Sequence, residues 1–188
     1  MGLIVLLLVQ AAIAQVVTLD YGKLAGSAAN GYSQFLGIPY ATAPTGPLRY
    51  KPPVLPIPMT GTYDATRFRD GCIPSTGPAS GFSEDCLFLS VFAPTKSIAS
   101  STLLPVVVYI HGGSFVSGAS GASGQFTNQF YNGTTFNKAA PSDRQSVIVT
   151  LNYRLGYLGF LASSDLAADG SLNLGLLDQR AALEWVQK

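Results

Sequence analysis

The sequence predicts an α/β protein with a mixed or parallel sheet, and three segments carry this prediction. Residues 106–110 (VVVYI) and 147–151 (VIVTL) are continuous apolar runs rich in β-branched side chains, a pattern typical of strands buried on both faces of a sheet. Residues 174–188 show helical periodicity, with Leu177 and Trp185 on one face, and both side chains are expected in the core. Buried strands joined by long connections are typical of a sheet covered by helices.

A single predicted helix cannot cover both faces of a buried parallel sheet. Residues 117–137 are rich in glycine, serine and asparagine and are expected to form a loop. Either residues 117–145 nevertheless contain a further helix, or the fold continues past Lys188.

The remaining elements follow in chain order. Residues 16–19 are expected to form a strand that enters a turn at Gly22, and residues 32–40 a second short strand. Residues 44–60 are rich in proline, which is unfavourable inside helices and central strands, so this segment is expected to be irregular. Residues 87–92 are expected to form another strand.

The N-terminus has the features of a secretory leader. Residues 3–9 are an apolar run, and Ala12 and Ala14 fit an A-x-A cleavage site before Gln15. The run is too short for a transmembrane helix. We expect a signal peptide over residues 1–14, a mature domain over 15–188 and a secreted, extracellular protein, with a buried N-terminal strand as the alternative.

Composition excludes several classes of partner. The formal net charge is +1, and charged residues make up 11% of the chain against about 25% in average globular domains. Without a basic patch, nucleic acid and anionic lipid are poor candidate partners. No second apolar stretch is long enough for a stable membrane anchor, and 47% hydrophobic residues are incompatible with general disorder.

Cys72 and Cys86 are separated by thirteen residues rich in proline, glycine and serine. In a secreted chain this favours a disulfide that closes a surface loop. Metal binding is the alternative, but the single histidine, His111, is distant and the spacing is wrong. No metal site and no cofactor are expected.

The most informative segment for chemistry is the end of the predicted strand at residues 106–110, where His111 is followed by Gly112 and Gly113. Consecutive glycines let the backbone approach a ligand closely, because no Cβ blocks its N–H groups. Such donors can stabilise an oxyanion transition state by about 3–4 kcal/mol each. A plain strand-to-loop turn is the alternative reading of the same residues.

Five segments resemble, in the same order, the motifs of the type-B carboxylesterases, the family that includes fungal lipases and cholinesterases. They span nearly all of the chain after the leader. They are residues 35–41 with 46–50, residues 84–91 (EDCLFLSV), residues 111–115 (HGGSF), residues 152–161 (NYRLGYLGFL) and residues 173–186 (NLGLLDQRAALEWV).

The resemblance implies the N-terminal portion of an α/β-hydrolase fold, with a mixed and mostly parallel central sheet. It also implies a Ser–Glu/Asp–His triad whose serine lies in a G-x-S-x-G elbow. No G-x-S-x-G occurs in residues 1–188, and His111 is a poor general base because of its place in the oxyanion loop. We therefore expect the triad to lie beyond Lys188 and this chain alone to be inactive.

Carried over from the family, the main-chain N–H groups of Gly113 and Ser114 would be the oxyanion donors. His111, Gly112 and Phe115 complete that loop. Ser114 replaces the usual third glycine, and its N–H can still donate if the backbone conformation is permitted. Phe115 either lines the rim of an acyl pocket or fixes the loop.

Other matched residues are expected to be structural. The resemblance implies two desolvated ion pairs, Arg49 with Glu84 and Arg154 with Asp178; exposed charges are the alternative for each pair. Asn132 begins an N-glycosylation sequon on the expected loop.

The expected substrate is a small-molecule or lipid ester. Cholinesterases of this family place a tryptophan for quaternary ammonium in the disulfide loop, where cation–π attraction holds the ligand. Here that loop offers only Phe82, which disfavours choline esters. Lipase and small-ester esterase activity are equally compatible with the sequence. The alternative function is that of a non-catalytic, cholinesterase-like adhesion or binding protein.

Overall fold

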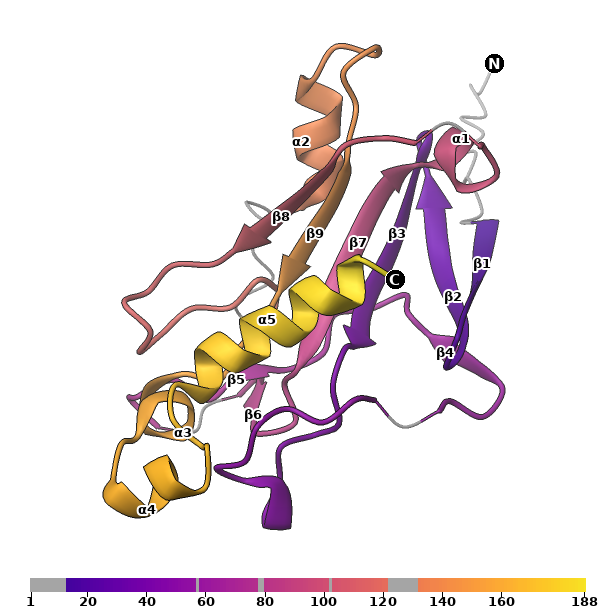
Figure 1. Cartoon of the computed structure of the whole chain (residues 1–188). Helices are drawn as coiled ribbons and strands as arrows, with labels where there is room; N and C mark the ends of the chain where they lie inside the picture. Colours follow the sequence, from indigo (N-terminus) through magenta and orange to yellow (C-terminus); the bar gives the residue numbers. More distant parts are fainter. Residues whose placement is uncertain (1–12, 57, 78–79, 102, 122–131) are drawn as a thin grey trace, which may run out of the picture.

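The structure, a computed structural model, describes residues 13–56, 58–77, 80–101, 103–121 and 132–188. Its main element is a seven-stranded sheet of order β1-β2-β3-β7-β9-β8, with β4 paired to β2 (Figure 1). The strands are β1 (Ile13–Leu19), β2 (Gly22–Ala29), β3 (Tyr32–Pro39), β4 (Thr62–Asp64), β7 (Phe88–Pro94), β8 (Val106–Ile110) and β9 (Val147–Leu151). A separate short pair is formed by β5 (Gly71–Cys72) and β6 (Phe82–Ser83). The expected leader, residues 1–14, lies almost entirely outside the described residues.

The described sheet is mixed but mostly antiparallel, so the expectation of a mostly parallel sheet is wrong for this part of the fold. The pairs β1–β2, β2–β3, β3–β7 and β7–β9 are antiparallel, and only β2–β4 and β8–β9 are parallel. Two-residue turns join β1 to β2 and β2 to β3, and a connection this short can only make an antiparallel pair. In the second turn Asn30 and Gly31 both have positive φ, as a tight hairpin requires.

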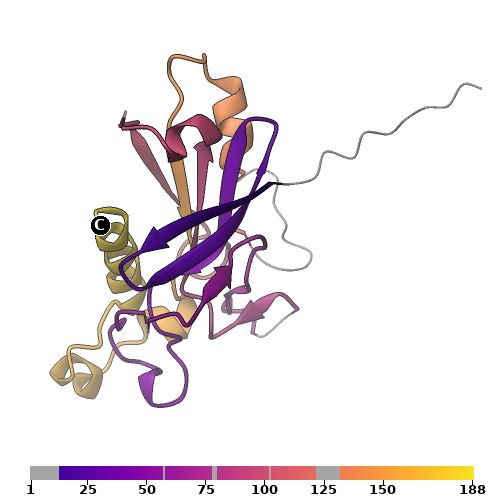
Figure 2. The ribbon, with the colours of Figure 1, turned by 90° about the vertical axis from the view of Figure 1, so that its right-hand side faces the viewer.

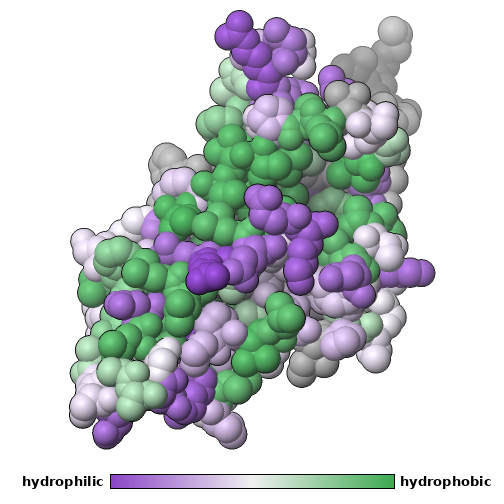
Figure 3. Space-filling view, viewed as in Figure 1, coloured by the Kyte–Doolittle hydropathy of each residue, from purple (hydrophilic) through white to green (hydrophobic). Residues whose placement is uncertain are grey.

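Burial differs between the two strands that the sequence predicted at their observed bounds. β9 is buried, as expected for a strand with neighbours on both sides. β8 pairs only with β9 among the described strands, and four of its five side chains are exposed, which contradicts the predicted burial on both faces. Figure 3 shows apolar surface in this region, above α5.

Helices pack on both sides of the sheet. α5 (Leu174–Val186) crosses one face, where Ala182 joins the core cluster that includes Val149 and Leu151 (Figures 1 and 2). α2 (Gly133–Ala139) packs on the opposite face, where Gly133 lies against Phe92 and Ile148. α2 is therefore a further helix within residues 117–145, the first of the two alternatives, and the expected loop over 117–137 is wrong from Gly133 onward.

The predicted helix is confirmed, but its buried face is rotated. The buried residues of α5 are Leu174, Gly175, Asp178 and Ala182, whereas Leu177 and Trp185 are only partly buried. The indole N–H of Trp185 donates to the hydroxyl of Tyr21 at 2.7 Å, and this polar contact accounts for its position at the edge of the core.

The remaining elements are short. They are η1 (Gly46–Leu48), α1 (Thr95–Ile98), α3 (Gly156–Phe160) and α4 (Ser164–Ala168). The proline-rich segment is otherwise irregular in its described residues, as predicted. Among the helices that the structure describes, none is long and apolar enough to span a bilayer.

Candidate functional site

The site is the turn that follows β8. Its backbone has positive φ at three successive residues, Gly113 (123°), Ser114 (55°) and Phe115 (62°). A Cβ at Gly113 would overlap the carbonyl oxygen of Ser117, so this position requires glycine. Left-handed serine and phenylalanine cost about 1–2 kcal/mol each, and such strain is concentrated at functional sites.

Hydrogen bonds inside the turn set the direction of the Ser114 N–H group. The carbonyl oxygen of Gly113 accepts hydrogen bonds from the N–H groups of Val116 (3.0 Å) and Ser117 (3.1 Å). This carbonyl belongs to the same planar trans peptide as the N–H of Ser114, so the two groups point in opposite directions. The Gly113 carbonyl faces into the turn, and the Ser114 N–H therefore faces out of it.

The N–H of Gly113 is oriented in the same way by its neighbour. The carbonyl oxygen of Gly112 lies 2.9 Å from Nδ1 of His111, and these two atoms can bond only if Nδ1 carries the proton. The Gly113 N–H shares a peptide plane with that carbonyl and points away from the imidazole. Neither the Gly113 nor the Ser114 amide donates to another residue of the described ranges.

His111 is a buried, neutral support for the turn. Its side chain is 3% exposed and stacks on Tyr153, with ring centroids 4.5 Å apart. Burial lowers the pKa of His111 below its usual value, and the hydrogen bond to Gly112 opposes that shift only in part. Nε2 is left as a buried acceptor with no partner among the described residues. This imidazole supports the loop, and its expected weakness as a general base stays a prediction.

Aromatic contacts fix the other end of the turn. Phe115 lies 5.0 Å from Phe160 and 6.4 Å from Tyr153 between ring centroids, yet 48% of its surface is exposed. The hydroxyl of Tyr153 donates to the carbonyl oxygen of His111 at 3.0 Å. Phe115 therefore holds the loop and also presents an apolar edge beside the outward-facing amides, so the two interpretations from sequence are compatible.

Asn152, at the end of β9, supports the loop behind the turn. Its Oδ1 accepts hydrogen bonds from the N–H (2.8 Å) and the hydroxyl (3.0 Å) of Ser120. The Ser120 segment lies against His111, because a Cβ at Gly118 would come within 2.6 Å of Nδ1 of His111. The sequence places Asn152 in a family motif but gives no sign of this role, because its partner is a main-chain group and a serine far away in the chain.

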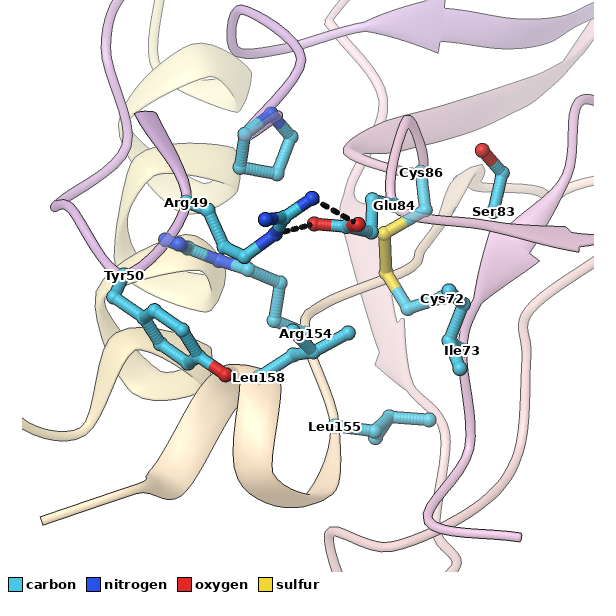
Figure 4. Close-up of a pocket in the computed structure, with 11 residues that line it drawn as sticks. Arg49, Tyr50, Cys72, Ile73, Ser83, Glu84, Cys86, Arg154, Leu155 and Leu158 are labelled. Atoms are coloured by element: carbon cyan, nitrogen blue, oxygen red, sulfur yellow. Dashed lines mark hydrogen bonds and ion pairs between the residues drawn. A yellow bond between two sulfur atoms is a disulfide. The ribbon is translucent and has the colours of Figure 1, made fainter. Parts of the chain in front are cut away.

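The disulfide between Cys72 and Cys86 is formed, with Cα atoms 4.9 Å apart and both residues buried. It borders a small pocket that also contains Arg49 and Glu84 (Figure 4). These two side chains make paired hydrogen bonds, one of them 2.7 Å between Nη2 and Oε1. The Arg49 side chain is nevertheless 45% exposed, so the pairing is confirmed and the expected desolvation is wrong. Solvent therefore reaches the guanidinium of Arg49.

The second ion pair is buried as expected. Arg154 and Asp178 are 4% and 0% exposed, and Nε and Nη2 of Arg154 donate to the carboxylate at 2.8 and 2.7 Å. Burial pushes the pKa of Asp178 upward, and the hydrogen bonds from Arg154 oppose that shift. This pair fixes α5 to the segment after β9 and does not touch the turn.

Asn132 lies at the N-cap of α2, and its Oδ1 accepts a hydrogen bond from the N–H of Thr134 at 2.9 Å. The sequon is thus at a helix start and not in a loop. Within the described ranges, no cluster of three or more histidine, cysteine, aspartate or glutamate residues could hold a metal ion.

Known proteins resemble this chain in sequence over most of its length. The Carboxylesterase family model matches residues 13–188. Para-nitrobenzyl esterase of Bacillus subtilis (strain 168) is 41% identical over 181 residues, which cover 93% of this chain and 34% of that protein. A protein from Dictyostelium discoideum named crystal protein is 37% identical over 178 residues, covering 92% of this chain and 30% of its own.

The fold agrees as well. The crystal structure of Aspergillus niger EstA matches with a TM-score of 0.81 and 41% identity, over 92% of this chain and 32% of that one. The chain thus spans about a third of the length of these relatives. The described part of the sheet is part of an α/β-hydrolase-like carboxylesterase fold. With the family model matched over residues 13–188, the chain belongs to the carboxylesterase family.

Proposed function

We propose that this chain supplies the oxyanion-stabilising segment of a serine carboxylic-ester hydrolase. The observation that carries the proposal is the outward direction of the Gly113 and Ser114 amides, both without a partner in the described ranges. When a nucleophile attacks an ester carbonyl, negative charge develops on its oxygen. Two fixed N–H donors stabilise that charge without reorganising during the reaction.

The nucleophile and the general base come from elsewhere. The chain contains no G-x-S-x-G elbow, and its one histidine is buried and neutral beneath the turn. We expect the purified 188-residue chain to hydrolyse p-nitrophenyl acetate no faster than buffer. Turnover above buffer would mean that a nucleophile and base are present that the sequence does not reveal.

A chimera tests the oxyanion role directly. Residues 13–188 would replace the matching third of Bacillus subtilis para-nitrobenzyl esterase, which supplies the rest of the chain. We expect the chimera to hydrolyse p-nitrophenyl acetate. Gly113→Ala keeps the main-chain N–H, but its Cβ would overlap the carbonyl oxygen of Ser117 and displace that N–H from the oxyanion. We therefore expect it to lower kcat by about 10²–10³-fold, the usual effect of losing an oxyanion donor.

Gly170→Ala is the matched control in the same chimera. Gly170 also has positive φ (70°), but a Cβ there would meet no atom within 4 Å. Equal turnover in the two variants would exclude the oxyanion role. A folded chimera that shows no hydrolysis at all would favour the non-catalytic alternative.

We further propose a carboxylic ester as substrate and an extracellular location. The apolar edge of Phe115 beside the amides suits the acyl or alcohol part of a small-molecule or lipid ester.

The leader pattern of residues 1–14 and the buried Cys72–Cys86 bridge favour an oxidising compartment. Glycosylation at Asn132 belongs to the same proposal. Mass spectrometry of the secreted protein, read for residue 15 as the N-terminus and for a glycan on Asn132, tests both points.

A further inference from the structure

Two main-chain hydrogen bonds that the proposed mechanism does not use hold the oxyanion turn, one from the disulfide loop and one from the start of α3. The N–H of Ser75, three residues after Cys72, donates to the carbonyl oxygen of Val116 at 2.8 Å. The N–H of Gly156, the first residue of α3, donates to the carbonyl oxygen of Phe115 at 2.7 Å. Donors from two separate segments thus hold adjacent carbonyls of the turn.

Ser75 and Gly156 also touch each other. Gly156 has φ of 52°, and a Cβ at this position would overlap the hydroxyl oxygen of Ser75 while lying 3.3 Å from its Cβ. The side chain of Ser75 therefore packs against the backbone of Gly156. The position of one donor depends on that of the other.

The two bonds fix two consecutive peptide planes. In the Phe115–Val116 peptide, the carbonyl is held by Gly156 and the N–H by the Gly113 oxygen. In the Val116–Ser117 peptide, the carbonyl is held by Ser75 and the N–H by the same Gly113 oxygen. Because peptides are planar, these two fixed peptides direct their N–H groups at the Gly113 carbonyl oxygen and so orient that carbonyl. The Ser114 N–H belongs to the same peptide as the Gly113 carbonyl and is oriented in the opposite direction.

We propose that Ser75 and Gly156 are positioning residues that aim the Ser114 amide, so that the disulfide loop controls the geometry of the oxyanion turn. The Cys72–Cys86 bridge contributes by limiting where Ser75 can lie, only three residues along the chain. The inference rests on the proposed oxyanion role for its catalytic meaning, but its structural content can be measured without any substrate.

The test starts with NMR spectroscopy of the unsubstituted chain. Through-hydrogen-bond couplings are expected from the Ser75 nitrogen to the Val116 carbonyl carbon and from the Gly156 nitrogen to the Phe115 carbonyl carbon. Absence of both couplings in the folded chain overturns the proposal. This measurement needs no variant and remains decisive if a substitution prevents folding.

Gly156→Ala then perturbs the contact, and Gly46→Ala is the matched control. Gly46 has φ of 54°, close to that of Gly156, but its Cβ would meet nothing within 4 Å. We expect Gly156→Ala to shift the Ser114 amide resonance and Gly46→Ala to leave it in place. Adding Ser75→Ala to Gly156→Ala removes the overlapping hydroxyl and should restore the resonance. An unmoved Ser114 signal in Gly156→Ala, or no restoration in the double variant, overturns the proposal.

In the chimera with para-nitrobenzyl esterase, Gly156→Ala should lower kcat about tenfold with little change in KM. The direction of the Ser114 N–H affects the stabilisation of the transition state more than the binding of the substrate. Ser75→Ala should again restore kcat. If the NMR shifts occur as expected while Gly113→Ala does not affect turnover, the positioning stands and the oxyanion role fails. If Gly113→Ala abolishes turnover but the Ser114 amide resonance does not move in Gly156→Ala, the oxyanion role stands and the positioning role fails.

Discussion

The carboxylate of Asp178 accepts three hydrogen bonds from Arg154, from the main-chain N–H, Nε and Nη2, at 3.1, 2.8 and 2.7 Å. A fourth Arg154 bond, from Nη1, goes to the carbonyl oxygen of Lys51 at 2.8 Å. One arginine thus joins the end of β9, the helix α5 and the proline-rich segment. The pair is structural, since it neutralises a buried guanidinium at the junction of three segments.

Asp178→Asn should therefore destabilise the chain strongly. Removing one partner leaves Arg154 as an uncompensated buried charge, which costs about 3–5 kcal/mol. Glu184→Gln is the control on the same helix, because its partner Arg180 and the glutamate itself are largely exposed. That change should cost at most about 0.5 kcal/mol. Urea unfolding measures both, and similar losses in the two variants would contradict the structural role of the pair.

The disulfide gives a second prediction. Cys72→Ser should loosen the loop between residues 72 and 86 and destabilise the chain by about 3 kcal/mol, because the unfolded chain regains the entropy that a loop of this size had lost. Limited proteolysis and urea unfolding measure the two effects. Cys86→Ser and the double variant should lose the same amount, since one bridge is lost in each case. Equal protease sensitivity in Cys72→Ser and the parent would count against the bridge.

The burial of His111 leads to a third prediction, a specific pH dependence of the free energy of unfolding. Its pKa in the folded chain is lowered by burial from the ordinary value of about 6.5. Between the lowered pKa and pH 6.5 the unfolded chain binds more protons than the folded chain, so stability decreases as the pH falls through this window. The slope from one group cannot exceed about 1.4 kcal/mol per pH unit. Stability gained from this group is fully present above pH 6.5.

Since His111 is the only histidine, its contribution can be isolated. His111→Asn keeps a side-chain N–H near the Gly112 carbonyl but does not titrate. Urea unfolding at several pH values between 5 and 7 should show that the free energy of unfolding changes less with pH in this variant than in the parent. Direct titration of the His111 ring signal by NMR checks the assignment, and a midpoint at or above 6.5 would refute it.

The sequence predicted elements where local pattern decides structure, and missed features that depend on neighbours. The bounds of β8 and β9 were correct because both are β-branched runs. Their different burial was not predictable, because no local pattern says which of them lies at the edge. β2 escaped prediction because it is poor in large apolar residues, although the Asn30-Gly31 pair marked a hairpin after it.

The site divides in the same way. The glycine turn was found because Gly112 and Gly113 have a sequence signature. The bonds from Ser75 and Gly156 were not, because main-chain hydrogen bonds between distant segments leave no trace in side-chain identity. Pairing of Arg49 with Glu84 followed from the family motif, but its exposure depends on how far the surrounding loops cover it.

Ser114 gives the last prediction, because it is the residue at which this turn departs from the family pattern. Its φ of 55° costs a serine about 1–2 kcal/mol relative to glycine. Glycine loses more conformational entropy on folding, by about 0.5–1 kcal/mol, so Ser114→Gly should be neutral or stabilising by up to about 1.5 kcal/mol. Ser142→Gly is the control, an exposed turn serine outside the left-handed region, and should lose about 0.5–1 kcal/mol. The free energies of unfolding in urea should therefore differ in sign or by at least about 0.5 kcal/mol between the two variants. An equal loss in both would show that Ser114 is not strained, and the turn would then not hold its amide by the geometry described above.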